Sequence, residues 1–152
     1  VKASPIDGLN IGADCLEYHD VDGATAQEPE SGSYYATYVF GPATIGYSKN
    51  YTAFAINAYS GDLTEAVEGT KYAVAFNVND NISISYGQRD YNDNTASDTA
   101  NSMEQEDSGF SVSYTAGGMT IGGHMNSSDN VGGNSNATAD KDSYEIGLSF
   151  AF

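Results

Sequence analysis

Large apolar residues alternate with small or polar ones along most of the chain. The alternation is clearest near the C-terminus, where Tyr144, Ile146 and Leu148 are separated by Glu145 and Gly147. A period of two places successive side chains on opposite faces of a β-strand. We expect eight strands of about 8–11 residues each. They begin near Leu9, Tyr34, Ala43, Tyr72, Ile82, Phe110, Met119 and Tyr144.

The predicted connections alternate strictly between short and long. Short turns stand at Gly41-Pro42, Asn79–Asn81 and Ala116–Gly118. The long polar connections hold most of the carboxylates; they are His19–Ser33, Ala53–Gly69, Asn92–Asp107 and Ser127–Asp142. This alternation is typical of a transmembrane barrel, whereas a soluble sandwich has similar loops at both ends. Within the second long connection, the spacing of apolar residues predicts one helical turn over Tyr59–Val67.

Aromatic residues gather near the predicted strand ends. Those near the long connections are Tyr34, Tyr51, Tyr72, Tyr91 and Tyr144, and those near the short turns are Phe40, Phe76, Tyr114, Phe150 and Phe152. Two such belts are typical of the interfacial girdles of membrane barrels. The pattern therefore predicts an all-β fold, an antiparallel transmembrane β-barrel meander, with one outer-membrane barrel segment over residues 1–152.

Composition narrows the possible functions. The chain has 21 Asp and Glu against 5 Lys and Arg, a net charge of −16, and a single arginine, which excludes nucleic acid as a partner. The two histidines, His19 and His124, lie on separate segments, and no nucleophile elbow or phosphate loop is present. We therefore expect no enzymatic activity and no required cofactor.

Two sequence features resemble those of a known family. The last residues match the C-terminal targeting signal of bacterial outer-membrane barrels, through Glu145, Gly147, Phe150 and Phe152. The segments Ser4–Ala13, Gly41–Gly46 and Gly118–Gly122 resemble hairpins of Gram-negative porins, especially the alphaproteobacterial general porins. The resemblance implies a homotrimer in the outer membrane that lets ions and small hydrophilic solutes diffuse passively. Its partners would be outer-membrane lipid and the barrel assembly machinery.

The resemblance also bears on the extent of the barrel. Val1–Ser4 resembles the tail of a preceding strand, and Pro5–Gly8 its short turn, so the chain is expected to be the C-terminal half of a 16-stranded porin. The alternative is a complete eight-stranded barrel with a structural or binding role. An eight-stranded barrel fills its interior with side chains, but the inward face here is mostly Gly, Ser, Ala, Thr and Asn. The voids would be costly, which favours the half-porin.

Strand parity selects candidate pore-lining residues. Facing the lumen would be Lys71, Arg89, His124, Glu145 and Asp14. The resemblance implies that Lys71 and Arg89 belong to a basic wall at the constriction of the pore. The alternative is an ordinary ion pair with Asp90, Asp14 or Glu145.

The acidic connections have two interpretations. Asp20 with Asp22, or Glu104 with Glu106 and Asp107, could bind Ca²⁺, which prefers oxygen ligands. A soluble calcium-binding β protein is accordingly a third possible identity. Alternatively, these carboxylates form a solvated fringe. Either way, a negative field at the mouth enriches cations, so weak cation selectivity is expected.

Overall fold

The computed structural model describes residues 1–18, 25–54, 56–57, 66–94, 104–132 and 140–151. Every regular element in those ranges is a β-strand, and the ranges contain no helix. The strands are β1 (Lys2–Ala3), β2 (Leu9–Glu17), β3 (Thr25–Gln27), β4 (Glu30–Phe40), β5 (Ala43–Ala53), β6 (Ile56–Asn57), β7 (Ala66–Asn77), β8 (Ile82–Asn94), β9 (Gln105–Ala116), β10 (Met119–Asp129) and β11 (Lys141–Phe150). The eight predicted strands are confirmed as β2, β4, β5 and β7 to β11.

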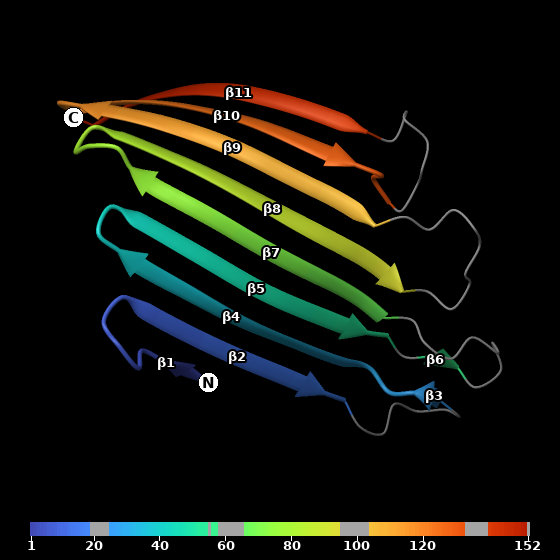
Figure 1. Cartoon of the computed structure of the whole chain (residues 1–152). Helices are drawn as coiled ribbons and strands as arrows, with labels where there is room; N and C mark the ends of the chain where they lie inside the picture. Colours follow the sequence, from blue (N-terminus) through green and yellow to red (C-terminus); the bar gives the residue numbers. More distant parts are fainter. Residues whose placement is uncertain (19–24, 55, 58–65, 95–103, 133–139, 152) are drawn as a thin grey trace.

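Nine strands form one antiparallel sheet in the order β1-β2-β4-β5-β7-β8-β9-β10-β11. Figure 1 shows them side by side in chain order, with the short turns at one end and the long connections at the other. β1 and β11 lie at opposite edges, and no pairing between them closes the sheet in the described part of the chain. The predicted all-β meander is thus confirmed, with the two-residue β1 as the expected tail of a strand before the Pro5–Gly8 turn.

The long connections differ from their prediction in detail. β3 and β6 pair with each other and bring the first two long connections together, although both were expected to be irregular. The predicted helical turn is wrong at its end, because Ala66 and Val67 begin β7; residues 59–65 lie outside the described ranges. Several strands also run past the alternating pattern, since backbone pairing continues where both faces become polar.

The ladders give the sheet two different faces. The apolar face carries Leu9, Ile11, Tyr34, Tyr38, Ile45, Tyr47, Tyr72, Val74, Phe76, Ile84, Tyr86, Phe110, Val112, Tyr114, Ile121, Met125, Tyr144, Ile146 and Leu148. The polar face carries Asn10, Gly12, Thr37, Gly46, Ser48, Lys71, Ala73, Ala75, Ser83, Ser85, Gly87, Arg89, Asp107, Gly109, Ser111, Ser113, Gly122, His124, Asn126, Ser143, Glu145 and Gly147. Most large apolar side chains therefore stand on one side, while the other side carries mainly small or polar residues.

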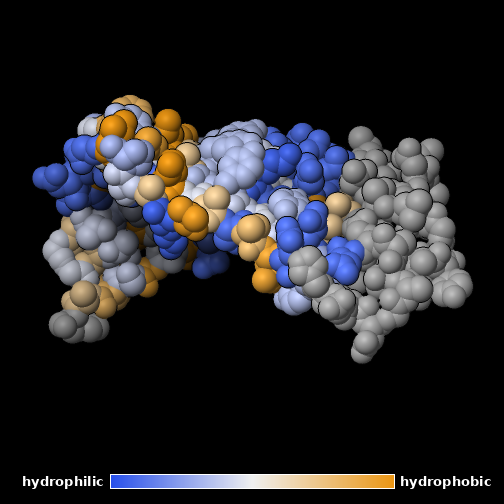
Figure 2. All heavy atoms as spheres, turned by 90° about the horizontal axis from the view of Figure 1, so that it is seen from below, coloured by the Kyte–Doolittle hydropathy of each residue, from blue (hydrophilic) through white to orange (hydrophobic). Residues whose placement is uncertain are grey.

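No second layer of described residues covers the apolar face. The buried hydrophobic residues of the described ranges are only Ala43, Ala53 and Val67, whereas Ile45 is 46% exposed and Leu148 57%. Figure 2 shows apolar residues open at the surface between the two ends of the sheet. The accessible surface is 10384 Å², against roughly 7400 Å² for a compact monomer of this mass. Backbone ladders, rather than an enclosed core, connect the strands.

Tight turns close the hairpins at one end. Gly41 and Gly117 have φ angles of 55° and 56°, which L side chains rarely adopt and which two-residue hairpin turns use. Gly8 has a φ of 77°, its carbonyl accepts the Val39 amide at 2.9 Å, and a Cβ there would collide with the Val39 carbonyl. The turn before β2 is thereby fixed against β4. Among the described residues, no helix is long and apolar enough to cross a membrane.

Candidate functional site: the polar face of the sheet

One row of directly paired residues crosses the whole polar face. It runs through Lys2, Gly12, Tyr35, Ser48, Lys71, Arg89, Asp107, Ser128 and Lys141. We name it the cationic row, because it holds four of the five Lys and Arg residues in a chain of net charge −16. Strand pairing alone assembles it, since its members are far apart in sequence. The row concentrates positive charge on a single level of the sheet.

Arg89 and Asp107 form the firmest polar contact in this row. The Arg89 Nε donates to Asp107 Oδ2 at 2.8 Å, and the Arg89 Nη2 bonds to the same oxygen. Gln105 donates to the other carboxylate oxygen at 2.9 Å, and the Arg89 guanidinium lies 5.8 Å from the centre of the Tyr91 ring. These two charge-assisted hydrogen bonds to one carboxylate oxygen hold the arginine close to the sheet.

The partner of Arg89 differs from the candidates chosen from sequence. The alternative interpretation named Asp90, Asp14 or Glu145, but the ladder places Asp107 directly opposite Arg89. Asp90 follows Arg89 in β8 and therefore lies on the other face. Counting alternation backwards from Phe110 would have given Asp107 the right face. The prediction missed it because Asp107 was assigned to a long connection.

Lys71 stands between Ser48 and Arg89 in the row. Its side chain is exposed, and the described residues give it no acidic partner. Two cations are therefore directly opposite on neighbouring strands, a pairing that is unfavourable unless an anion lies nearby. Both residues face the polar side of the sheet, as parity predicted.

The three other predicted pore-lining residues also lie on the polar face. His124 Nε2 and Glu145 Oε2 are 3.7 Å apart on β10 and β11. Asp14 accepts a hydrogen bond from the Ser33 hydroxyl. The structure does not bring these residues together with Lys71 and Arg89, because they occupy other levels and other strands. They therefore do not form one site with Lys71 and Arg89.

The residues considered for calcium do not converge in the described ranges. Glu106 and Asp107 are consecutive in β9, so their side chains point to opposite faces, and Asp107 is already bound to Arg89. Across the described residues no group of three His, Cys, Asp or Glu could hold a metal ion, and this includes Glu104. Asp20 and Asp22 lie outside the described ranges.

The described residues include only part of the predicted targeting signal and of the predicted aromatic belts. Glu145, Gly147 and Phe150 of the targeting signal belong to the edge strand β11, while Phe152 lies outside the described ranges. Tyr34, Tyr51, Tyr72 and Tyr144 belong to the apolar face as expected. Tyr91 is the exception, because its register places it on the polar face beside Arg89.

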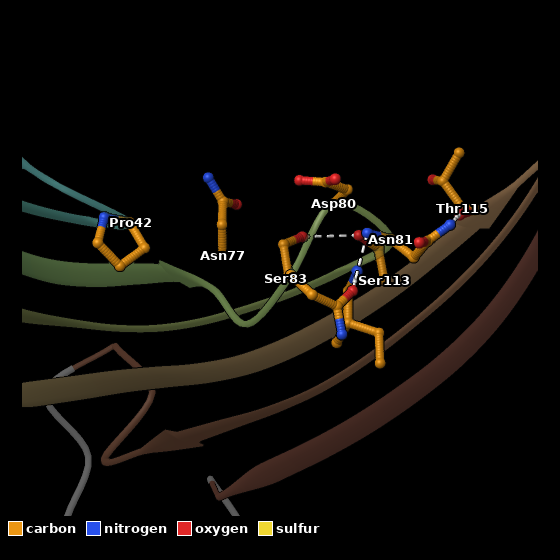
Figure 3. A pocket seen from close by; sticks show the side chains of 9 residues that line it. Pro42, Asn77, Asp80, Asn81, Ser83, Ser113 and Thr115 are labelled. Atoms are coloured by element: carbon orange, nitrogen blue, oxygen red, sulfur yellow. Dashed lines mark hydrogen bonds between the residues drawn. The ribbon is translucent and has the colours of Figure 1, made fainter.

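A polar hollow of about 510 Å³ lies where the β7–β8 turn meets β9. Figure 3 shows its hydroxyl and amide groups, with Asn81 and Ser83 beside β9. The Asn81 side chain donates to the Thr115 carbonyl at 2.6 Å, and the Ser83 and Ser113 hydroxyls are 2.8 Å apart. Further along the same strand pair, the hydroxyls of Ser85 and Ser111 are 2.7 Å apart. This surface can exchange hydrogen bonds with water or a hydroxylated solute.

No covalent chemistry is indicated by the described polar face. Ser111 lies opposite His124, which lies opposite Glu145, yet the Ser111 hydroxyl is engaged by Ser85 instead of the imidazole. A serine nucleophile needs a base within hydrogen-bond reach and an oxyanion site, and this row provides neither in the described residues. The groups can attract ions and form hydrogen bonds.

Comparison with known proteins gives one structural match. No protein-family model matches the chain, and no curated protein matches it in sequence. Among solved structures, the chain is similar to the NanC porin in a rhombohedral crystal form, with a TM-score of 0.67 and 17% sequence identity. The match covers 99% of this chain and 76% of that one. At this identity the likeness shows a shared fold, and that fold is the strand meander of a porin.

Proposed function

We propose that the chain forms part of the wall of an outer-membrane porin, a channel through which small hydrophilic solutes and ions diffuse passively. The observation that carries the proposal is the division of the sheet into two unlike faces. Nine strands expose large apolar side chains on one face and small or charged ones on the other. Barrel porins turn the first kind of face toward lipid and the second toward water.

A lipid environment accounts for the uncovered apolar face. In water, an apolar surface of this extent would be an aggregation liability, whereas in a bilayer it needs no second protein layer. The terminal residues Glu145, Gly147 and Phe150, with their resemblance to a targeting signal, support the outer membrane of a Gram-negative bacterium. The partners would then be outer-membrane lipid and the barrel assembly machinery, and the family resemblance supports a homotrimer.

The open edges support a barrel larger than this sheet. Unpaired backbone groups along β11, and along β1 and the part of β2 that β1 does not cover, would cost several kcal/mol each within lipid. Further strands of the same polypeptide, placed before β1, would pair with both edges and close the barrel. In that arrangement the chain is the C-terminal part of a porin. The sequence predicted that the closed barrel has 16 strands and that this chain is half of it. The match to the NanC porin covers 76% of that chain, which supports a closed barrel with fewer strands.

Channel activity can be tested in planar lipid bilayers. The protein is extracted from outer membranes in mild detergent and added at low concentration between unequal KCl solutions. We expect stepwise openings with a linear current–voltage relation and a reversal potential that favours K⁺ over Cl⁻. The excess of 21 acidic over 5 basic residues is the reason for the cation preference.

The controls separate a channel from other small barrels. Slower or faster migration of unboiled protein on a gel, compared with boiled protein, reports a folded barrel. A barrel by this criterion that gives no steps would contradict the porin proposal and favour a structural or binding role. Folding without detergent would instead favour the soluble calcium-binding protein. An anion-favouring reversal potential would contradict only the selectivity.

A further inference from the structure

Two hollows flank Lys71 on the polar face. One has a volume of about 260 Å³ and is lined by Tyr35, Gly46, Ser48 and Ala73. The other, of about 380 Å³, lies between β7 and β10 and is lined by Ala73, Gly87, Arg89, Asp107, Gly109, Asn126 and Ser128. Lys71 and Ala73 line both. The lysine therefore stands at the junction of two recesses in the wall.

The charges around this junction are unbalanced. Arg89 is neutralised by Asp107 through two hydrogen bonds to one carboxylate oxygen. Lys71 is left as a cation opposite that arginine, and no acid of the described residues pairs with it. Its other neighbour in the row is the Ser48 hydroxyl, which is able to donate a hydrogen bond. An anion at the Lys71 ammonium would balance this remaining charge, with the Ser48 hydroxyl as a further donor.

The shape of the hollows selects among anions. On the turn side of Lys71 the lining residues Gly46, Ala73 and Gly87 have no polar side-chain atoms. Thr37 lines the first hollow there as well, and its methyl carbon lies 3.6 Å from where a Cβ of Gly46 would stand. A carboxylate at the Lys71 ammonium could place a short hydrocarbon chain against these residues. Asn126 limits the space further along, because its side-chain oxygen lies 2.7 Å from where a Cβ of Gly109 would stand. A compact ion such as chloride would gain nothing from the apolar lining.

We propose that Lys71, with Ser48 and Arg89 beside it, forms a binding site for short-chain monocarboxylate anions on the pore wall. The proposal deepens the proposed channel function and rests on it, because the hollows must face the water-filled lumen. The site would slow a carboxylate during its passage without any chemical step. It is a local feature of the wall, distinct from the negative field expected at the mouth.

If this site binds carboxylates, the conductance of the channel should saturate as the carboxylate concentration rises. In bilayers, conductance in potassium butyrate should approach a plateau as concentration rises, whereas conductance in KCl should rise in proportion to it. In the variant Lys71→Gln the half-saturating butyrate concentration should rise at least about threefold, because the charge-assisted hydrogen bond is lost. Lys71→Arg should retain the plateau.

Lys141→Gln and Lys2→Gln are matched controls, since both remove one charge from the same row on strands that do not line either hollow. They should leave the half-saturating concentration unchanged. Equal effects in all three Gln variants would overturn the site in favour of a diffuse field, and a wild-type conductance proportional to butyrate would overturn it outright. In either case KCl conductance would still support the channel.

A second measurement does not depend on conduction. Saturation-transfer NMR on the folded protein in deuterated detergent should detect magnetisation transfer to butyrate protons, reduced in Lys71→Gln and retained in Lys141→Gln. Unboiled gel migration confirms that each variant is folded. Transfer of equal size in both variants would overturn the proposal, even for a protein that gave no channel steps.

Discussion

Glycine positions show how closely neighbouring strands are fitted at the scale of single residues. Gly32 in β4 lies opposite Tyr51 in β5, and the Tyr51 ring covers it so closely that an added Cβ would be 2.6 Å from a ring carbon. Because real Cβ contacts are essentially never under 3.0 Å, a side chain here must displace the ring. Both residues have extended backbone, so the constraint is steric rather than conformational.

We therefore expect Gly32→Ala to destabilise the folded protein by roughly 1–3 kcal/mol, as overpacking does. Gly122→Ala is the matched control, because it is also within a strand and the nearest atom to its added Cβ is a backbone oxygen at 4.0 Å. Urea unfolding in lipid vesicles, followed by unboiled gel migration, measures both. Loss of stability in Gly122→Ala but not in Gly32→Ala would contradict the steric explanation.

Side-chain direction could be predicted from sequence, whereas most partners could not. Alternation placed Lys71, Arg89 and His124 on the polar face, and the ladders confirm it. Partner choice depends on register between strands, and the sequence does not specify where one strand aligns with the next. Arg89 and Asp107 are an example. The long connection between their strands is shorter than predicted, and the register of β8 against β9 places the two residues opposite each other.

Strands are the next scale, and β7 shows the two faces most simply. Tyr72, Val74 and Phe76 point to the apolar face and Lys71, Ala73 and Ala75 to the polar face. Val74 is 44% exposed, although it is apolar. Adjacent residues of one strand are therefore expected to meet lipid and water respectively, which makes them a matched pair for testing the orientation of the sheet.

Lys substitutions at Val74 and Ala75 should consequently have unlike effects. Val74→Lys should cost about 2–4 kcal/mol of folding free energy in lipid, the cost of lysine on a lipid face near the bilayer midplane. Ala75→Lys should fold normally and lower single-channel conductance, since it narrows the water-filled side. Folding titrations in vesicles and bilayer recordings measure the two effects. Equal destabilisation by both variants would contradict the assignment of faces.

The sequence predicted strand centres better than strand ends. Centres carry the strict alternation that burial against lipid or a core imposes, as in β11 with Tyr144, Ile146 and Leu148. The strand ends lack this alternation, because β8 continues to Asn94 and β10 to Asp129 through polar residues whose backbones still pair. The short β3–β6 pairing likewise has no side-chain periodicity to reveal it, since the two segments have three and two residues.

At the scale of the whole molecule the described strands form an open sheet with two unpaired edges, and this is the scale at which the sequence was least informative. Strand number in a closed barrel depends on tilt and stagger, which no local pattern encodes. The small residues of the polar face argue against closure by these strands alone, since they would leave voids in a narrow interior. The number of strands that close the proposed barrel therefore depends on the length of the polypeptide made in the cell.

The intact mass of the polypeptide isolated from the outer membrane answers that question. Half of a 16-stranded porin, as predicted from sequence, implies about twice the 16.0 kDa of this chain. A barrel of which this chain is 76%, as in the match to the NanC porin, implies 16.0/0.76, or about 21 kDa. A mass of 16.0 kDa would contradict closure by preceding strands. The edges formed by β1 with β2 and by β11 would then have to be paired by another copy, because lipid cannot satisfy their backbone groups.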